Sequence, residues 1–168
     1  VVSDAWRTTP TLVGRHVTLR PLVAKDKDAL VAVAATDDLW NIFYASVSQL
    51  KDADRWFAAT FAQVEQGRAL VFAVCDPAGA VVGTTRYMRM NEGHRRLEIG
   101  GTFYATRVQR TGVNTEAKRL LLTHAFDAMG VQCVQIRTDA LNIRSQRAIE
   151  RLGAKRDGVL RGHQIVGG

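Results

Sequence analysis

The sequence predicts a mixed α/β fold, an α+β mixed sheet in which an antiparallel meander precedes alternating strand and helix units. The first observation is periodicity, because apolar residues recur either at every second position or at helical spacing. The second is order, because the expected elements run β-α-α-β-β-β-α-β-α-β and late parallel strands need crossover helices. The third is size, since a chain of 168 residues suits a single domain over residues 1–168.

The first half of the chain contains an opening strand and two helices. Residues 12–19 alternate between apolar and polar side chains and are expected to form one strand. Residues 26–35 have the apolar spacing of a short helix. A second helix is expected over residues 52–66, where the apolar side chains from Trp56 to Val64 share one face.

Three strands of a meander are expected next. Residues 69–75 are apolar throughout, and the Asp76–Gly79 turn leads to a returning strand over residues 80–90. A second turn, Asn91–His94, leads to a third strand over residues 96–104. Such short connections favour antiparallel pairing.

The last third of the chain alternates helix and strand. Helices are expected over residues 112–129 and 142–152, and a glycine follows each of them. Strands are expected over residues 131–138 and, after the second helix, residues 154–160.

The composition excludes several classes of protein. Hydrophobic residues make up 46% of the chain and charged residues 23%, which is typical of a globular protein rather than a disordered one. The longest apolar runs, residues 29–35 and 69–75, are too short to span a membrane, and no signal peptide is expected. Cys75 and Cys133 lie in apolar stretches without metal-ligand spacing, which predicts two buried thiols in a cytoplasmic protein without a metal.

The positive charge is concentrated late in the chain. Of the net charge of +7, residues 107–168 carry most, with 11 Lys and Arg against 5 Asp and Glu. Three interpretations remain open: a pocket for a polyanion such as a nucleotide or coenzyme A, a nucleic-acid surface, or a solvated basic face. The order of elements matches neither a helix-turn-helix nor a zinc finger, so nucleic acid is the less favoured partner.

The segment before the long late helix has the features of an anion site. A helix N-terminus offers free backbone N–H groups, and Gly112 lets the backbone approach an anion closely. Arg107 and Arg110 flank this glycine, which favours a pyrophosphate site. The alternative is a plain turn capped by Asn114 or Thr115.

Three segments, in order along nearly the whole chain, resemble the GNAT N-acetyltransferase superfamily. Residues 109–114, Gln-Arg-Thr-Gly-Val-Asn, resemble its acyl-CoA signature Q/R-x-x-G-x-G/A, with Asn114 at the last position. Residues 138–154 resemble its Asn-x-x-Ser helix ending in Leu-Gly-Ala. Residues 12–22 resemble the opening of the ribosomal-protein-alanine (RimJ/RimL-like) type.

The resemblance implies a GNAT-like fold with a splayed central strand pair and transfer of an acetyl group from acetyl-CoA to a primary amine in a ternary complex. The acceptor stays open between a protein N-terminus and a small amine, and a homodimer is possible for such folds. Family members usually carry one more long strand after the segment matching residues 160–163, and this last strand is expected to be absent here. Either the sheet is one strand short or the sequence stops before that strand. The alternative function is a non-catalytic basic module that binds acyl-CoA or nucleic acid.

The resemblance also implies which residues bind the cosubstrate. They lie at the end of the third meander strand, in the loop and first turn of the long helix, and at the start of the last helix. The cofactor-binding candidates are Phe103, Val108, Gln109, Arg110, Thr111, Gly112, Val113, Asn114, Thr115, Asn142 and Ser145.

Glu98 is the candidate general base. A primary amine must lose a proton to attack, and an ordinary ammonium titrates well above neutral pH. Glu98 is expected on the same strand face as Gly100 and Thr102, where it could also contact the acceptor. The alternative is an ordinary strand carboxylate paired with Arg86 or Arg96.

Other side chains complete the expected site. Ser145 is the candidate proton donor to the leaving thiolate, and Tyr104 is the alternative donor. The backbone N–H near Thr102 or Phe103 is expected to donate to the thioester oxygen. The resemblance further implies that Trp40 and Tyr44 contact the acceptor.

Overall fold

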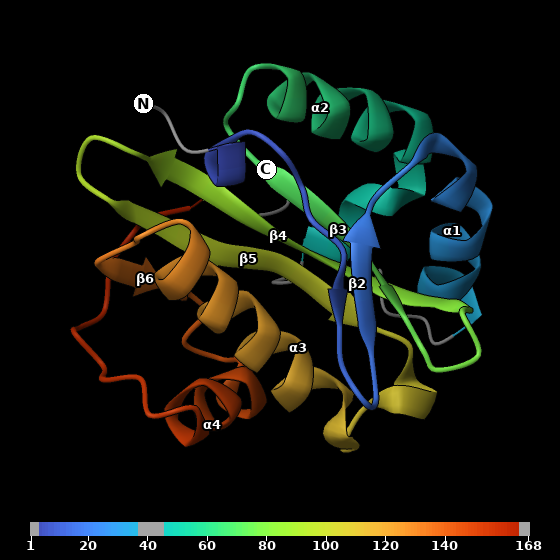
Figure 1. Ribbon diagram of the computed structural model, residues 1–168. Helices are drawn as coiled ribbons and strands as arrows, with labels where there is room; N and C mark the ends of the chain where they lie inside the picture. The colour runs from blue at the N-terminus through green and yellow to red at the C-terminus, as the bar shows by residue number, and fades with distance from the viewer. Residues whose placement is uncertain (1–3, 37–45, 165–168) are drawn as a thin grey trace.

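Six strands form one sheet, and their spatial order follows the chain (Figure 1). The computed structural model describes residues 4–36 and 46–164. The first five strands pair antiparallel, and the sixth pairs parallel with the fifth. The strands are β1 (Leu12–Val13), β2 (Thr18–Pro21), β3 (Leu70–Cys75), β4 (Val81–Asn91), β5 (Arg96–Tyr104) and β6 (Cys133–Gln135).

The helices cover both faces of this sheet. In Figure 1, α3 lies in front of the sheet, while α1 and α2 pack on the other side. A π-helix, His124–Ala128, continues α3 and completes the helix expected over residues 112–129. The α-helices are α1 (Lys27–Thr36), α2 (Ala53–Glu65), α3 (Gly112–Thr123) and α4 (Ile143–Arg151).

The hydrophobic core has two parts because β3 is buried on both faces. Leu70, Phe72 and Val74 belong to the cluster shared with α3. Val71 and Ala73 alternate with them and belong to the cluster shared with α1 and α2. A strand covered on both faces reads as a continuous apolar run, which is why residues 69–75 contain no polar position.

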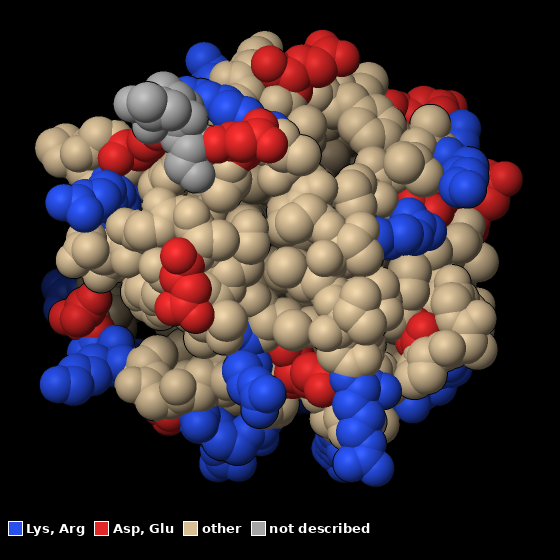
Figure 2. All heavy atoms as spheres, viewed as in Figure 1, with Lys and Arg blue, Asp and Glu red and all other residues tan. Residues whose placement is uncertain are grey.

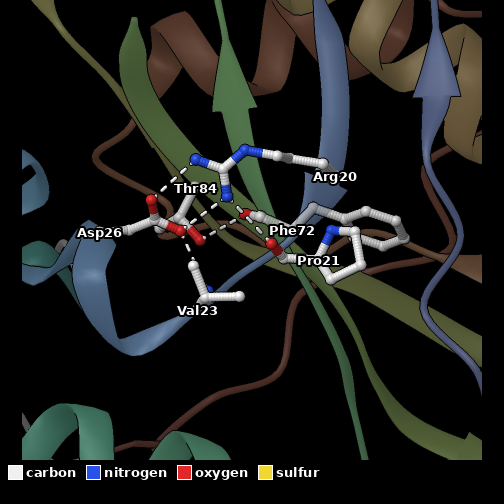
Figure 3. Close-up of polar contacts among 6 residues, drawn as sticks. All are labelled: Arg20, Pro21, Val23, Asp26, Phe72 and Thr84. Carbon is white, nitrogen blue, oxygen red and sulfur yellow. Dashed lines mark hydrogen bonds and ion pairs between the residues drawn. The ribbon is translucent and has the colours of Figure 1, made fainter. Parts of the chain in front are cut away.

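An ion pair fixes the chain between β2 and α1 (Figure 3). The Arg20 guanidinium donates to both oxygens of Asp26, at 2.7 and 2.8 Å, and the second oxygen also accepts from the Val23 backbone N–H. Asp26 is buried, so the bidentate geometry compensates for part of the cost of removing its charge from water. The contact positions α1 against the sheet.

The pair β5–β6 is splayed. Pairing covers only Arg96–Glu98 of β5 and Cys133–Gln135 of β6, while β5 continues to Tyr104. Beyond Glu98 the backbone groups on that side of β5 are therefore not bonded to β6. This agrees with the splayed central pair that the family resemblance implies.

A bulge interrupts β5 at its glycine pair. Gly100 is opposite Arg86, and Phe103 is opposite Thr84, so Gly101 and Thr102 together face the single residue Thr85. Gly101 has a φ of 56°, a conformation that side chains other than glycine rarely adopt. The extra residue turns Thr102 towards α3, so the expectation that it shares a face with Glu98 is wrong.

Three strand predictions are corrected. Residues 12–19 form two strands, because the chain reverses at Gly14 and its N–H donates to the Val17 carbonyl at 2.8 Å. The strand predicted over residues 131–138 is shorter, because among the described strands β6 pairs only with β5 and lies at the edge of the sheet. Residues 154–160 form no strand, since they are exposed and pair with nothing in the described part of the chain.

The remaining class predictions concern membranes and thiols. No helix within residues 4–36 and 46–164 is long and apolar enough to cross a membrane. Both cysteines are free; Cys75 is buried as expected, whereas Cys133 is exposed because its strand lies at the sheet edge. Trp40 and Tyr44, the two expected acceptor contacts, lie outside the described residues.

Candidate active site

The loop between β5 and α3 is held by its own polar side chains. Thr111 caps α3, since its hydroxyl accepts from the Val113 N–H at 3.3 Å and donates to the Val108 carbonyl at 2.6 Å. The cap is therefore Thr111, not Asn114 or Thr115. The Gln109 amide donates to the Tyr104 carbonyl at 2.8 Å, which ties the loop to the end of β5.

The two arginines of this loop have different surroundings. Arg107 forms an ion pair with Asp76 at 3.0 Å, so its charge is already partnered by the β3–β4 turn. Arg110 is exposed and has a φ of 60°, which marks the sharp turn before α3. Arg110 is thus the loop cation that remains available to an anion at the N-terminus of α3.

The β1–β2 turn lies directly on the first turns of α3. The Glu116 carboxylate accepts the backbone N–H groups of Arg15, His16 and Val17 at 3.0, 2.5 and 3.1 Å. This contact places the His16 ring beside Gly112, where a Cβ would lie 2.9 Å from the ring carbon Cδ2. The absence of a side chain at residue 112 therefore makes room for His16.

The start of α4 lies against the same loop. Asn142 caps α4 by accepting from the Ser145 N–H at 3.0 Å, and Ser145 is half-buried. Arg144 donates to the Gln109 side chain at 2.5 Å, which joins the two segments. Figure 2 shows Lys and Arg gathered along the lower edge of the molecule, over the region where the β1–β2 turn, the start of α3 and α4 lie.

Glu98 is buried on β5 where the splay begins. Its Oε2 accepts from Arg89 at 2.9 Å and from Arg137 at 2.9 Å, so the expected partners Arg86 and Arg96 are wrong. Within residues 4–36 and 46–164, no donor binds Oε1. Burial raises the pKa of Glu98, and the Arg89 charge opposes that shift.

Tyr104 lies inside the core cluster shared with α3. Its hydroxyl is buried and has no hydrogen-bond partner in the described part of the chain. Burial raises the pKa of this hydroxyl well above its ordinary value. Its neighbour Phe103 packs on the opposite face, against the cluster shared with α1 and α2.

Lys118 is a buried residue that the sequence did not single out. Its Nζ donates to Thr102 at 2.8 Å and to Thr85 at 3.4 Å, beneath the β5 bulge. Burial lowers the pKa of Lys118 to about 7. The sequence did contain an indication that Lys118 is buried. Lys118 lies three residues before the buried Leu121 and therefore borders the apolar face of α3.

Arg86 is the second buried cation that the sequence missed. Its guanidinium carbon lies 5.5 Å from the ring centroid of Trp56 on α2. A Cβ at Gly101 would lie 2.4 Å from its Nε, so the glycine leaves the space that the guanidinium fills. The sequence shows the glycine pair Gly100-Gly101, which predicts a bulge or a close backbone approach, but no pattern shows that Arg86 fills the space beside it.

These elements define a class of protein. The N-terminus of α3, with the exposed Arg110 before it, adjoins the open end of a splayed strand pair, and a buried carboxylate lies where that pair separates. Such an arrangement can hold the phosphates of an acyl-CoA and present its acyl group beside a base. Among the described residues, no group of three or more His, Cys, Asp and Glu could hold a metal ion.

Residues 16–155 match the acetyltransferase (GNAT) domain family, so the chain belongs to this family and is an N-acetyltransferase. It is 23% identical over 164 residues to the uncharacterized N-acetyltransferase YoaA of Bacillus subtilis, covering 95% of this chain and 90% of that protein. Members of this family transfer an acetyl group from acetyl-CoA to an amine.

Solved structures share the fold. A probable GNAT-family acetyltransferase of Chromobacterium violaceum superposes with a TM-score of 0.82 at 29% identity, covering 95% of this chain and 81% of that one. Mycobacterium smegmatis RimJ, in complex with CoA-disulfide, superposes with a TM-score of 0.79 at 20% identity, covering 98% of this chain and 83% of that one. Because the sequence identity with RimJ is low, this similarity shows only that the fold is shared.

Proposed function

We propose that this chain acetylates a primary amine by direct attack on acetyl-CoA in a ternary complex, as one domain over residues 1–168 in the cytoplasm. The observation that carries the proposal is the capped N-terminus of α3 beside the splay between β5 and β6. The acceptor is a small amine or a protein N-terminus. Trp40 and Tyr44 remain predicted acceptor contacts, and a homodimer remains a possible assembly.

The cosubstrate fits along these two features. Its pyrophosphate lies on the backbone N–H groups of the first turn of α3, with Arg110 beside it. Its pantetheine arm follows the unpaired edge of β5, which offers backbone donors and acceptors beyond Glu98. The capped start of α4, with Asn142 and Ser145, lies near the thiol.

The reaction needs a proton acceptor and a proton donor. The neutral amine nitrogen attacks the thioester carbon, the C–N bond forms, and the C–S bond breaks. The nitrogen gives its proton to Glu98 Oε1, directly or through a water, and Glu98 then releases that proton to solvent. The leaving thiolate takes a proton from Ser145 as the Ser145 hydroxyl regains one from water. Ser145 is preferred over Tyr104 because the Tyr104 hydroxyl is enclosed in the core. A backbone N–H near Phe103 stabilises the developing oxyanion.

Thermal melts with acetyl-CoA test the phosphate site. A ligand at 100 times its Kd adds about 2.7 kcal/mol to the free energy of unfolding. We expect Gly112→Pro to weaken this effect, because Gly112 is the first residue of α3, where proline is tolerated but deletes one N–H. Thr111 is extended, with a ψ of −174°, and can precede proline.

The matched control keeps that N–H. Gly112→Pro and Gly112→Ala are both made with His16→Ala, which removes the ring that any Cβ at residue 112 would meet. The proline variant should bind acetyl-CoA about tenfold more weakly than the alanine variant. Equal affinity would contradict the assignment of this loop. A melt shifted by duplex DNA alone would favour the nucleic-acid alternative.

Glu98→Gln tests the base. The substitution keeps the size and one acceptor oxygen but cannot take a proton, so kcat/KM at pH 7 should fall by about 10²-fold or more. The loss should narrow above about pH 8, where more of the amine is already neutral. Acetyl-CoA binding should not change, and Glu92→Gln, at a surface turn, should leave the rate as it is. An unaltered pH–rate profile would contradict the role of Glu98 as a base and would favour the alternative, in which it only forms ion pairs.

A further inference from the structure

Arg86 is a buried cation without an anionic partner on the α2 face of the sheet. It is 8% exposed, yet within residues 4–36 and 46–164 no carboxylate and no other acceptor binds its guanidinium. Its guanidinium carbon lies 5.5 Å from the centroid of the Trp56 ring. Burial lowers the pKa of Arg86, which reflects the unfavourable desolvation of its charge.

The glycine at residue 101 leaves the space that this guanidinium occupies. Gly101 has a left-handed φ of 56°, and a Cβ there would meet three guanidinium atoms of Arg86 at 2.4 to 3.1 Å. Any other residue at 101 would displace the arginine. The bulge, the glycine and the Trp56 ring together hold the Arg86 head in one position.

The same glycine pair brings Arg86 close to the proposed base. Gly100 is directly opposite Arg86 in the sheet. A Cβ at Gly100 would lie 3.4 Å from Glu98 Oε1, the oxygen without a donor in the described ranges. The unpaired guanidinium and the unpaired carboxylate oxygen thus border neighbouring residues on one face of β5.

An unpartnered buried guanidinium is costly to keep. Removing a charge from water without compensation is unfavourable, and the cation–π contact with Trp56 offsets part of this cost. A ligand oxyanion would supply the missing partner through paired N–H donors. The phosphates of the cosubstrate have their own loop at the start of α3, so the partner of Arg86 belongs to the other substrate.

We propose that the acceptor amine carries an oxyanion, a carboxylate or a phosphate, within a few bonds of its nitrogen, and that Arg86 binds this group while the amine faces Glu98. The proposal rests on the proposed function, because it names the substrate class of the same site. It makes Arg86 a specificity-determining residue that contacts substrate.

Matched acceptors test the proposal. Glycine is compared with glycinamide, and 2-aminoethyl phosphate with 2-aminoethanol, by following release of the CoA thiol. A carboxylate next to the amine keeps more of that amine protonated than the amide does, so a preference for glycine would run against intrinsic reactivity. We expect kcat/KM to favour an anionic member by about tenfold or more. The pair that shows the larger preference identifies the oxyanion.

Arg86→Met carries the second half of the test. It removes the charge while a flexible apolar chain still covers Trp56, so the rate with the anionic member should fall by about tenfold or more and the rate with the neutral member should stay. Arg55→Met, on the exposed side of α2, should change neither. Arg86→Lys should restore the charge but only part of the preference, because lysine lacks the planar fork.

Three results would overturn the proposal. In the first, the unaltered protein has the same kcat/KM with the anionic and the neutral acceptor of each pair. In the second, Arg86→Met lowers the rate with both acceptors equally. In the third, Arg86→Met keeps the preference for the anionic acceptor. If no amine in the panel is acetylated, calorimetric titration of the same compounds into the CoA-saturated protein decides, since only the anionic members should bind and only when Arg86 is present. Failure of acetyl-CoA to bind would instead refute the proposed function.

Discussion

At the scale of one residue, Lys118 shows how burial changes the pKa of a side chain. It lies under the β5 bulge with hydroxyl partners and without a carboxylate among the residues described. Its pKa of about 7 in the folded chain lies far below the ordinary value near 10.4. Between these two values the unfolded chain binds more protons than the folded chain, so stability rises with pH across that window.

Lys118→Met should therefore stabilise the protein most at low pH. Methionine is close in size and carries no charge, so the gain in free energy of unfolding at pH 6 should exceed the gain at pH 9.5 by about 3 kcal/mol. Denaturant titrations at the two pH values measure this difference. Lys155→Met, at an exposed position, is the matched control, and the same gain at both pH values would contradict a depressed pKa.

Single residues also mark the limit of prediction from the sequence. Glu98 could be identified as a candidate because it is a carboxylate on the strand that precedes the segment resembling the acyl-CoA signature. Its partners could not, because Arg137 comes from beyond α3 and Arg89 sits at a second irregularity of β4, with a φ of 48°. The face of Thr102 was wrong for a similar reason, since one inserted residue reverses the alternation of a strand.

At the scale of elements, Glu116 joins the β1–β2 hairpin to α3. One carboxylate satisfies three successive N–H groups of the turn, and these bonds hold the pKa of Glu116 below its ordinary value although burial opposes them. The stabilisation is present above the ordinary pKa of a glutamate and is lost as pH falls through the lower value in the folded chain.

Glu116→Gln should loosen this junction. An amide offers one acceptor oxygen without charge, so the free energy of unfolding at pH 7 should fall by about 1–3 kcal/mol. The difference from the unaltered protein should shrink below about pH 4, where the glutamate is protonated as well. Thermal melts across this range measure it. Glu150→Gln, exposed on α4, should show no such dependence, and a constant difference would contradict the contact.

Elements with strong local signals were predicted well. The third meander strand has the predicted bounds, residues 96–104, and α2 differs by one residue at each end from the predicted 52–66. Residues 12–19 failed because the turn at Gly14 is stabilised from a distance by Glu116, which no local pattern shows. Residues 154–160 failed because a strand needs a neighbour, and none of the described strands pairs with them.

At the scale of the whole molecule, the fold brings basic residues from the last third of the chain together near the start of α3. The last third of the chain carries most of the net charge of +7, and α4 brings part of it to the start of α3. Arg151 reaches Thr115 at 3.4 Å, next to Arg144 on Gln109. The sequence alone left three interpretations of the basic charge open, and the family match favours the pocket for coenzyme A.

The stacking of Arg86 on Trp56 gives the protein a built-in optical signal. An excited indole is more dipolar than in its ground state, so a bare positive charge beside the ring shifts its emission, and an anion that neutralises the charge shifts it back. Trp6 lies in the other core cluster, hydrogen-bonded to the Met129 carbonyl at 2.8 Å, and is remote from such a change. In a Trp40→Phe variant, the fluorescence of Trp56 would thus report occupancy of the Arg86 position before any bond is made.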